Sequence, residues 1–254
     1  MTPKKTSATA VGTIVPITHA PAYELVVDQI RRAIHLGRYL PGEKLPPERD
    51  LAGQLGVSRT TVREAVRLLE GEGLLTIRRG ATGGLIVSGP HKASAQELRS
   101  RVQKHQKELA DIFDYRLAVE CCTARLAAER RTKSDMRQLD DALQRMESFI
   151  ESRGRDHTES ISQFNAADAD FHIGIALAAK NPYLVEAVEE IRTAMFLPVG
   201  AIFNRLRTDA NAHHDVILAA IRDQDGELAS TEMAEHIEDT RLELRAFLRG
   251  RKSR

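Results

Sequence analysis

The sequence has few cysteines, no long apolar run and almost no net charge. Its only two cysteines are the neighbours Cys121 and Cys122, which excludes a disulfide framework and leads us to expect a reducing cytoplasm. No uninterrupted apolar stretch approaches the roughly 20 residues that cross a bilayer, so an integral membrane protein is excluded. Residues 1–18 have neither a continuous apolar core nor a cleavage signal, and we expect a flexible tail rather than a signal peptide.

The near-zero net charge conceals an uneven distribution along the chain. The total is +1, from 37 Lys and Arg against 36 Asp and Glu, and an even spread would argue against a nucleic-acid partner. Residues 1–107, however, carry 17 Lys and Arg against 9 Asp and Glu, a net charge of +8. Residues 108–254 carry 20 against 27, a net charge of −7. This asymmetry indicates nucleic-acid binding by the basic part, with a merely solvated basic surface as the alternative.

The first part of the chain has the pattern of short helices followed by a β-hairpin. Gly56 is expected to end the second helix, and Ser58 to cap the third. The proline-rich segment 39–47 is expected to form a turn-rich connector. Apolar spacing predicts helices over 23–36, 48–55 and 58–70, and strands over 74–78 and 85–87.

The remaining residues have the spacing of a wholly helical region. The first of these helices has a possible break near Lys104, and Pro198 is expected to kink or interrupt a later one. Asn181 and Pro182 form a helix start, as N-cap and first helical residue. The predicted helices cover 96–130, 135–152, 158–179, 182–204, 209–223 and 226–249.

These patterns predict a mainly α protein of two domains, in keeping with its 254 residues. The fold class is a winged helix-turn-helix, with helices and a β-hairpin wing, followed by an all-α antiparallel helical bundle. The expected divisions are a tail at 1–18, the winged domain at 19–88, a linker and start of the first bundle helix at 89–107, and the bundle at 108–250.

The third helix carries a polar face suited to the major groove of DNA. Arg59, Thr60, Thr61, Arg63 and Arg67 lie within nine positions. Arg can chelate guanine O6 and N7, whereas Ser and Thr hydroxyls suit phosphate oxygens. An exposed basic helix that packs on a neighbour and binds nothing is the alternative.

The surrounding residues resemble the winged helix-turn-helix signature of GntR-family transcriptional regulators. The resemblance spans some seventy residues, through Pro41-Gly, Leu45-Pro, Glu48-Arg-x-Leu-Ala, Leu55-Gly-Val-Ser-Arg-x-Thr-Val-Arg-Glu-Ala65 and Glu72-Gly. It implies sequence-specific binding to double-stranded operator DNA, with the wing tip in the minor groove. The implied DNA-binding residues are Arg49, Ser58, Arg59, Thr60, Thr61, Arg63, Arg79 and Gly80.

Three histidines and one aspartate form a candidate metal site in the helical region. Asp168 and His172 are four residues apart and therefore share a helix face, while His214 and His236 fall on the last two helices. Three imidazoles and a carboxylate suit Zn²⁺, Ni²⁺ or Mn²⁺. From the residues alone, a hydrogen-bonded histidine is an alternative, and His213 competes with His214.

Residues 108–248 resemble the FCD effector domain of the FadR-type branch of the same family. The resemblance lies in Arg116-x3-Glu120 with the Ala-rich segment after it, in Asp168-x2-Phe-His172, and in His214-x2-Ile with His236-Ile. It implies a divalent metal, zinc before nickel or manganese, held by Asp168, His172, His214 and His236. It also implies a small carboxylate effector with Arg116 as its charge partner, unless Arg116 only pairs with Glu120.

The expected function is that of a ligand-responsive transcriptional regulator rather than an enzyme. We expect a cytoplasmic homodimer, with no membrane partner, that binds a pseudo-palindromic operator. One alternative is a metal-dependent enzyme fused to a DNA-binding module, although no motif supplies a general base or a phosphate loop. Another is a helical domain with a purely structural metal.

Overall fold

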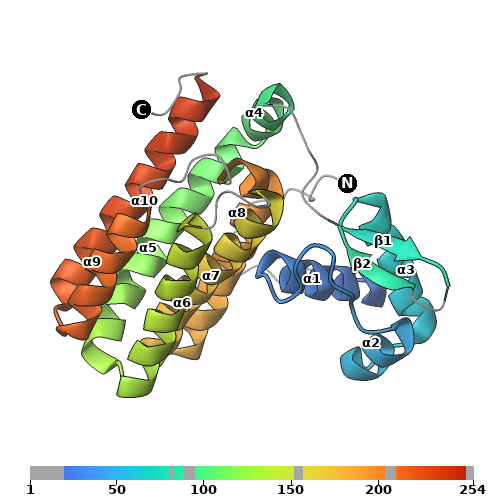
Figure 1. The fold of residues 1–254 in the computed structure, drawn as a ribbon, viewed down its shortest axis with the longest axis horizontal. Helices are drawn as coiled ribbons and strands as arrows, with labels where there is room; N and C mark the ends of the chain where they lie inside the picture. The colour runs from blue at the N-terminus through green and yellow to red at the C-terminus, as the bar shows by residue number, and fades with distance from the viewer. Residues whose placement is uncertain (1–19, 81–82, 89–94, 152–156, 204–209, 250–254) are drawn as a thin grey trace, which may run out of the picture.

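The computed structural model describes residues 20–80, 83–88, 95–151, 157–203 and 210–249, which form ten helices and one two-stranded sheet (Figure 1). The predicted tail at 1–18 lies outside the described residues. The fold class predicted from the sequence is confirmed: a winged helix-turn-helix precedes an all-α bundle.

Three helices form the N-terminal part, namely α1 (Ala22–His35), α2 (Glu48–Leu55) and α3 (Arg59–Gly71). Gly56 ends α2 with φ of 66°, a left-handed conformation that favours glycine. Ser58 caps α3, because its Oγ accepts a hydrogen bond from the Thr61 backbone N–H at 3.1 Å. The two stop and start signals therefore act as the sequence predicted.

A β-hairpin follows, with β1 (Leu75–Arg78) antiparallel to β2 (Gly84–Val87). The register places Leu75 opposite Val87 and Arg78 opposite Gly84. The proline-rich connector does more than turn, since Lys44 forms an isolated bridge with Ile86. Lys44 thus pairs with the free edge of β2. Positions 46 and 47, which follow the bridge, are prolines and have no backbone N–H to donate to a longer ladder.

The winged part has its own apolar core. Val26, Val27, Ile30 and Ile34 of α1 pack against α3, in a cluster that also contains Leu75, Leu85 and Val87 of the hairpin. Four α3 residues spaced three or four apart are fully buried, as an amphipathic helix requires. They are Val62, Ala65, Val66 and Leu69.

The helical bundle comprises α4 (Ala95–Lys104), α5 (Gln106–Arg130), α6 (Lys133–Glu151), α7 (His157–Ala178), α8 (Pro182–Phe203), α9 (Ala210–Arg222) and α10 (Gly226–Leu248). The break expected near Lys104 is confirmed between α4 and α5. The Asn181 side chain accepts from the Tyr183 backbone N–H at 3.1 Å, which confirms the start of α8. An interruption at Pro198 is wrong, because α8 continues to Phe203; a proline removes only one backbone donor, and a long helix keeps its other hydrogen bonds.

The long helix α5 lies inside the bundle and packs against α7, α8, α9 and α10. Around it lies a second apolar core, distinct from that of the winged part, which includes Phe113, Phe171, Ile217 and Ile237. Helix α1 lies between the bundle and the rest of the winged part (Figure 1). The bundle interior is not wholly apolar, because it also contains buried polar side chains, among them three histidines.

Candidate functional site

The outer face of α3 is polar and accessible. Arg59, Thr60, Arg63 and Arg67 are exposed, whereas the opposite face of the helix is buried in the winged core. A helix held by one apolar face and presenting guanidinium groups on the other fits the width of the major groove. The structure therefore places the predicted DNA-reading residues of α3 where DNA can reach them.

Ser58 and Thr61 also have a structural role at the start of α3. Their hydroxyl oxygens lie 2.8 Å apart, in addition to the cap between Ser58 Oγ and the Thr61 N–H. Thr61 is half-buried, while Ser58 and Thr60 are exposed. The pair thus orients the first turn of α3, and Arg59 lies in that turn.

Acidic neighbours hold two of the predicted DNA-contacting arginines. Arg63 Nη2 lies 3.2 Å from Glu48 Oε2, at the first residue of α2. Arg49 Nε lies 3.0 Å from Asp50 Oδ1, and the Arg49 side chain is 77% exposed. Glu48 and Arg63 are fifteen positions apart, and nothing in the sequence indicated that they would be in contact.

The predicted wing contacts, Arg79 and Gly80, are exposed where β1 ends. The Gly83 backbone N–H donates to the Gly80 carbonyl at 2.9 Å and so closes the turn. The intervening residues 81–82 lie outside the described residues. Arg79, near the tip of the hairpin, is therefore exposed, as the arginines of α3 are.

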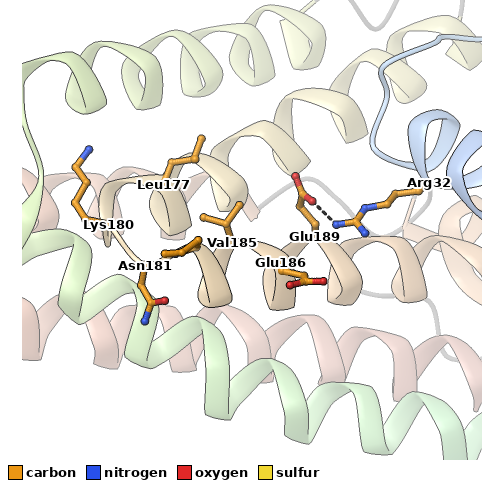
Figure 2. A pocket seen from close by; sticks show the side chains of 8 residues that line it. Arg32, Leu177, Lys180, Asn181, Val185, Glu186 and Glu189 are labelled. Atoms are coloured by element: carbon orange, nitrogen blue, oxygen red, sulfur yellow. Dashed lines mark hydrogen bonds and ion pairs between the residues drawn. The ribbon is translucent and has the colours of Figure 1, made fainter. Parts of the chain in front are cut away.

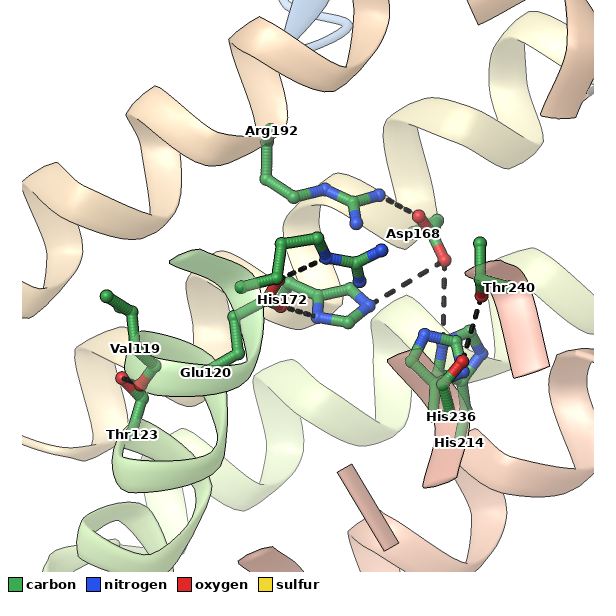
Figure 3. A network of polar contacts seen from close by, with 10 residues as sticks. Val119, Glu120, Thr123, Asp168, His172, Arg192, His214, His236 and Thr240 are labelled. Carbon is green, nitrogen blue, oxygen red and sulfur yellow. Dashed lines mark hydrogen bonds and ion pairs between the residues drawn. The ribbon is translucent and has the colours of Figure 1, made fainter. Parts of the chain in front are cut away.

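Three histidines from three helices meet inside the bundle. His172 comes from α7, His214 from α9 and His236 from α10, and each is at most 3% exposed. Their ring centroids lie 5.6, 5.3 and 4.6 Å apart in pairs. One nitrogen of each ring lies within 4.8 Å of the others, so the three could hold a metal ion. Figure 3 shows the imidazoles converging.

Asp168 lies beside this cluster, one helical turn before His172. Its Oδ1 lies 3.4 Å from His214 Nε2 and 4.0 Å from His172 Nε2. Its Oδ2 forms an ion pair with Arg192 of α8 (Figure 3). The carboxylate therefore faces the histidines with one oxygen and a guanidinium with the other.

The structure also decides between the two adjacent histidines of α9. His213 lies at the surface, where its Nε2 is 2.9 Å from Asp239 Oδ2 and its side chain is 25% exposed. His214 is fully buried and joins the cluster. The His213 ring also lies 6.0 Å from the His236 ring, but His213 is not among the three histidines whose nitrogens lie within 4.8 Å of one another.

A buried ion pair lies on the other side of His172. Glu120 Oε2 is 2.5 Å from His172 Nδ1, and Glu120 Oε1 accepts from Arg116 Nε at 2.6 Å. Arg116 is 1% exposed, and its Nη2 has no hydrogen-bond partner within the part of the chain that the structure describes. Arg116 therefore has the predicted pair with Glu120 and retains donor capacity beyond it.

Burial and charge determine the protonation of this site. Burial alone raises the pKa of Glu120, but Arg116, His172 and Arg192 together hold the pKa well below its usual range. Burial is also the largest influence on His172 and lowers its pKa; Arg192 lowers it further, against the raising effect of Glu120. His172 is therefore neutral, and a neutral imidazole is the form that binds metals.

The donor set fits a divalent ion of borderline softness. Three imidazoles with an adjacent carboxylate are ligands of Zn²⁺ and its neighbours. Glu120 beside His172 Nδ1 matches the carboxylate–histidine arrangement that orients a metal-binding ring. The residues that would hold the ion are His172, His214 and His236, with Asp168 Oδ1 next to them.

Arg192 is the site residue that the sequence analysis missed. It occupies the inward stripe of α8, four residues after Val188 and three before Met195, both of which are buried. A charged residue on an apolar stripe was the available signal, since an unpaired charge is rarely buried. Only the structure identifies Asp168 as its partner.

The remaining findings concern the whole chain. Among the described residues, no helix has the length and apolar character to cross a membrane. The model of the FCD domain matches residues 111–239, and the model of bacterial regulatory proteins of the gntR family matches residues 22–82.

Curated proteins of similar sequence are transcriptional regulators. The Exu regulon transcriptional regulator of Escherichia coli is 31% identical over 235 residues, covering 87% of this chain and 84% of that protein. The Uxu operon transcriptional regulator of the same organism is 32% identical over 235 residues, covering 89% and 87%. A putative L-lactate dehydrogenase operon regulatory protein of E. coli is 31% identical over 238 residues, covering 87% and 86%.

A solved structure, E. coli McbR/YncC, shares the fold with a TM-score of 0.54 at 21% identity, covering 89% of this chain and 98% of that one. The curated relatives extend over both the winged part and the bundle, and they are regulators rather than enzymes. The chain therefore belongs to the gntR family of bacterial regulatory proteins, as a transcriptional regulator with an FCD domain.

Proposed function

We propose that this regulator is of the FadR type and that a divalent metal and a small carboxylate effector in its bundle modulate sequence-specific operator binding. The observation that carries the proposal is the buried polar cluster: three histidines with an aspartate, next to an arginine that retains an unused donor. Burial of such groups is costly unless they are paired or bind a ligand. The active form is proposed to be a cytoplasmic homodimer.

DNA reading is assigned to Arg49, Ser58, Arg59, Thr60, Thr61 and Arg63 with the wing residues Arg79 and Gly80. Arg59→Ala and Arg63→Ala should each weaken binding to a selected operator by about 1–3 kcal/mol, because each removes a guanidinium that reads a base. Gel shifts with the operator and with a scrambled duplex measure the effect, which should be larger on the operator.

Arg67→Ala is the matched control for this experiment. Arg67 is exposed on the same helix, two turns from Arg59, and as a phosphate contact it should weaken both duplexes alike. It should also flatten the dependence of log K on log salt by about one unit. Operator affinity that survives the Arg59/Arg63 double substitution would contradict the assignment.

The metal is assigned to His172, His214 and His236 with Asp168, and zinc is the first candidate before nickel and manganese. When bound, the ion supplies a positive centre to which an oxygen ligand can coordinate. The chain's own groups then have separate roles: Glu120 orients the His172 ring, and Arg192 holds the second oxygen of Asp168.

Metal content of the purified protein tests this assignment. One equivalent of a divalent metal should accompany the wild type, and His214→Ala should lower the metal affinity at least about tenfold, because a buried ligand is removed. His213→Ala is the control, because His213 pairs with Asp239 and is not one of the three clustered histidines. A metal content that His213→Ala lowers and His214→Ala leaves unchanged would reverse the assignment.

The effector is assigned to the class of small carboxylates, with Arg116 as its charge partner. The unused Nη2 of Arg116 supports this, because guanidinium groups bind carboxylates in two-point contacts. The name of one relative, a regulator of an L-lactate dehydrogenase operon, is in keeping with the class. A purely structural metal is the second candidate, since the three histidines are each at most 3% exposed.

A thermal-shift screen of small carboxylates on the metal-loaded protein distinguishes the two. An effector at a hundred times its Kd should stabilise the fold by about 2.7 kcal/mol. Arg116→Lys keeps a charge beside Glu120 but loses the planar fork, so it should retain metal and lose this stabilisation. If the protein binds one equivalent of metal and no carboxylate raises its thermal stability, the metal has a structural role.

A further inference from the structure

A polar pocket with a volume of about 450 Å³ lies between α6 and α7. This volume is in the range of small-molecule sites. The residues that each helix contributes are spaced three or four apart, so they form one face of that helix. On α6 they extend from Ser134 to Arg145, roughly 16 Å along the helix axis. We call this hollow the α6–α7 pocket; its charged residues are Arg38, Arg137, Asp141, Arg145 and Asp170.

The charges that line the α6–α7 pocket do not balance. Three arginines and two aspartates line it, which leaves one positive charge in excess. Arg38 comes from the winged part, three residues after the end of α1, and the other four come from α6 and α7. An excess cation in a concave surface favours an anionic ligand, because the protein walls reduce the screening by solvent.

Two of the three arginines are oriented by the aspartates. Arg145 donates from Nε to Asp141 Oδ2 at 2.9 Å and from Nη1 to Asp170 Oδ2 at 3.1 Å. Arg38 donates from Nη1 to Asp170 Oδ1 at 2.7 Å. A guanidinium group carries five N–H donors in one plane. Both arginines are therefore held in place and still have donors for a further acceptor.

Arg137 supplies the excess charge. It is exposed and lies one helical turn before Asp141 on α6. Asp141 pairs with Arg145, one turn further along, and not with Arg137. Within the described part of the chain, Arg137 has neither an ion pair nor a side-chain hydrogen bond. Its guanidinium group is therefore available to an anion that enters the pocket.

The floor of the pocket is apolar and closed by the packing of the two helices. A Cβ at Gly174 would lie 2.9 Å from Leu139 Cδ2, so the glycine allows α6 and α7 to approach closely at this point. Ile173 is buried, whereas Leu177 is 48% exposed. A ligand can therefore rest its carbon atoms on this floor while its polar groups reach the rim.

The rim also offers groups that bind hydroxyls. The Ser134 hydroxyl and the Gln138 amide lie on the same face of α6 as Arg137. Both groups can donate and accept hydrogen bonds, and the two carboxylates can accept them from a hydroxyl. The chemistry of the lining thus fits a ligand that combines one anionic group with several hydroxyl groups.

The α6–α7 pocket is separate from the histidine cluster. Asp170 and Gly174 each lie two positions from His172, which places them about 200° around α7 from that ring. The lining of the pocket and the three clustered histidines have no residue in common. A ligand in the pocket therefore needs neither the metal nor Arg116.

A neighbouring pocket, which Figure 2 shows, shares Leu177 but lacks the charge excess. Its lining has two cationic and two acidic side chains. Arg32 pairs with Glu189, as the dashed line in Figure 2 marks, and Lys180 Nζ lies 2.8 Å from Asp135 Oδ1. Both cations of this pocket are thus compensated, and the charge argument for an anion applies to the α6–α7 pocket alone of the two.

We infer that the α6–α7 pocket binds a small hydroxylated anion, with a phosphate or carboxylate group on Arg137. The hydroxyl groups of the ligand contact the aspartates and the remaining donors of Arg38 and Arg145. This site goes beyond the proposed function and depends on neither its metal nor its effector.

Isothermal titration calorimetry of the full-length protein at low salt tests the site with glucose 6-phosphate, gluconate and glucose. At least one of the two anions should bind, and the tighter one identifies the charged group as phosphate or carboxylate. Glucose should bind at least about tenfold more weakly, because it lacks the charge. Inorganic phosphate and hexanoate carry the charged groups without hydroxyls, and each should bind more weakly than its hydroxylated counterpart. Equal affinities would overturn the role of the hydroxyls.

Substitutions locate the bound anion. Arg137→Gln should weaken the binding by about tenfold or more, because a charge-assisted contact is lost. Arg125→Gln is the matched control: it removes the same charge from an exposed arginine of α5 that pairs with Glu129 and should leave the affinity unchanged. Binding of neither anion to the wild type, or equal affinity in Arg137→Gln and the wild type, would overturn the site. Loss of binding in Arg116→Lys but not in Arg137→Gln would place the anion in the buried cluster instead, which overturns this inference and supports the proposed effector site.

Discussion

Burial controls the charge of histidines at two places in this protein. In the bundle it keeps His172 neutral, as metal binding requires. In the winged part, burial and secondarily the charge of Arg31 lower the pKa of His35 to about 3. His35 therefore stays neutral in the folded state at pH values where an exposed histidine takes up a proton.

This difference predicts a stability that depends on pH. Unfolded His35 titrates near 6.5, so the unfolded state binds more protons below that pH and the free energy of unfolding falls as the pH drops. The loss from His35 is absent above about pH 7, reaches about 2 kcal/mol at pH 5 and continues towards the folded pKa. Denaturant melts between pH 5 and 8 measure it.

His35→Gln should flatten this dependence, because glutamine has no proton to gain. Equal slopes for His35→Gln and the wild type would show that His35 is accessible to protons in the folded state.

Within the bundle, single residues act as parts of one network. Glu120 contacts both Arg116 and His172, and Asp168 contacts both Arg192 and His214. Removing one member of such a network leaves another buried and unpaired. Substitutions that keep charge or shape, such as Arg116→Lys, are therefore more informative than truncation to alanine.

At the scale of elements, the start of α3 combines a helix cap with residues that we propose contact DNA. The Ser58 side chain caps the helix, and Arg59 is the first residue that it orients. Ser58→Ala should lower the free energy of unfolding by about 1 kcal/mol, because the capping acceptor is lost. Thermal or denaturant unfolding measures this effect.

Ser58→Asp separates the two roles of this residue. Aspartate caps about as well as serine, so the stability should stay near that of the wild type. Its negative charge at the DNA-facing end of α3 should weaken operator binding, which is strongly electrostatic. Equal operator affinity for Ser58→Asp and the wild type would place Ser58 outside the DNA interface.

Elements were predictable from the sequence where local chemistry decides them. Gly56 ends α2, Asn181 starts α8, and the apolar spacing of α3 identifies its inner face. One local expectation differs from the structure: Pro198 does not interrupt α8, because a long helix keeps its other backbone hydrogen bonds. The connector has the expected turns, and Lys44 in addition pairs with Ile86 of β2, a contact that local chemistry does not decide.

For the whole molecule, the charge asymmetry has a structural meaning. The basic segment contains the winged part with its exposed arginines, and the acidic segment contains the bundle. The positively charged winged part is attracted to DNA, while the negatively charged bundle is repelled by the phosphates. The molecule therefore approaches DNA with the winged part first. Near-zero net charge is therefore compatible with a DNA-binding protein.

The proposed homodimer predicts two-fold recognition. Light scattering after gel filtration should give twice the chain mass, and footprinting should show two inverted half-sites about one helical turn, roughly 10 base pairs, apart. Scrambling one half-site should weaken binding strongly, because only one winged part can then read bases. A monomer that binds a single half-site as tightly as the full operator would contradict the dimer.

By itself, the sequence determined the elements, the polar face of α3 and the residue types of the candidate metal site. Helix periodicity, caps and motif spacing are local, and residues such as Ser58 and Arg59 act together within one turn of chain. Asp168 and His172 also lie one turn apart, so their shared face followed from spacing alone.

Only the tertiary structure decided which distant side chains meet. It chose His214 over His213, paired Arg192 with Asp168, and set Leu36 against α7 and α8. Each of these depends on how helices pack across tens of residues, and helix rotation within a bundle follows from the fit of many side chains at once. The candidate metal site and the contact of Leu36 with α7 and α8 are consequences of that packing.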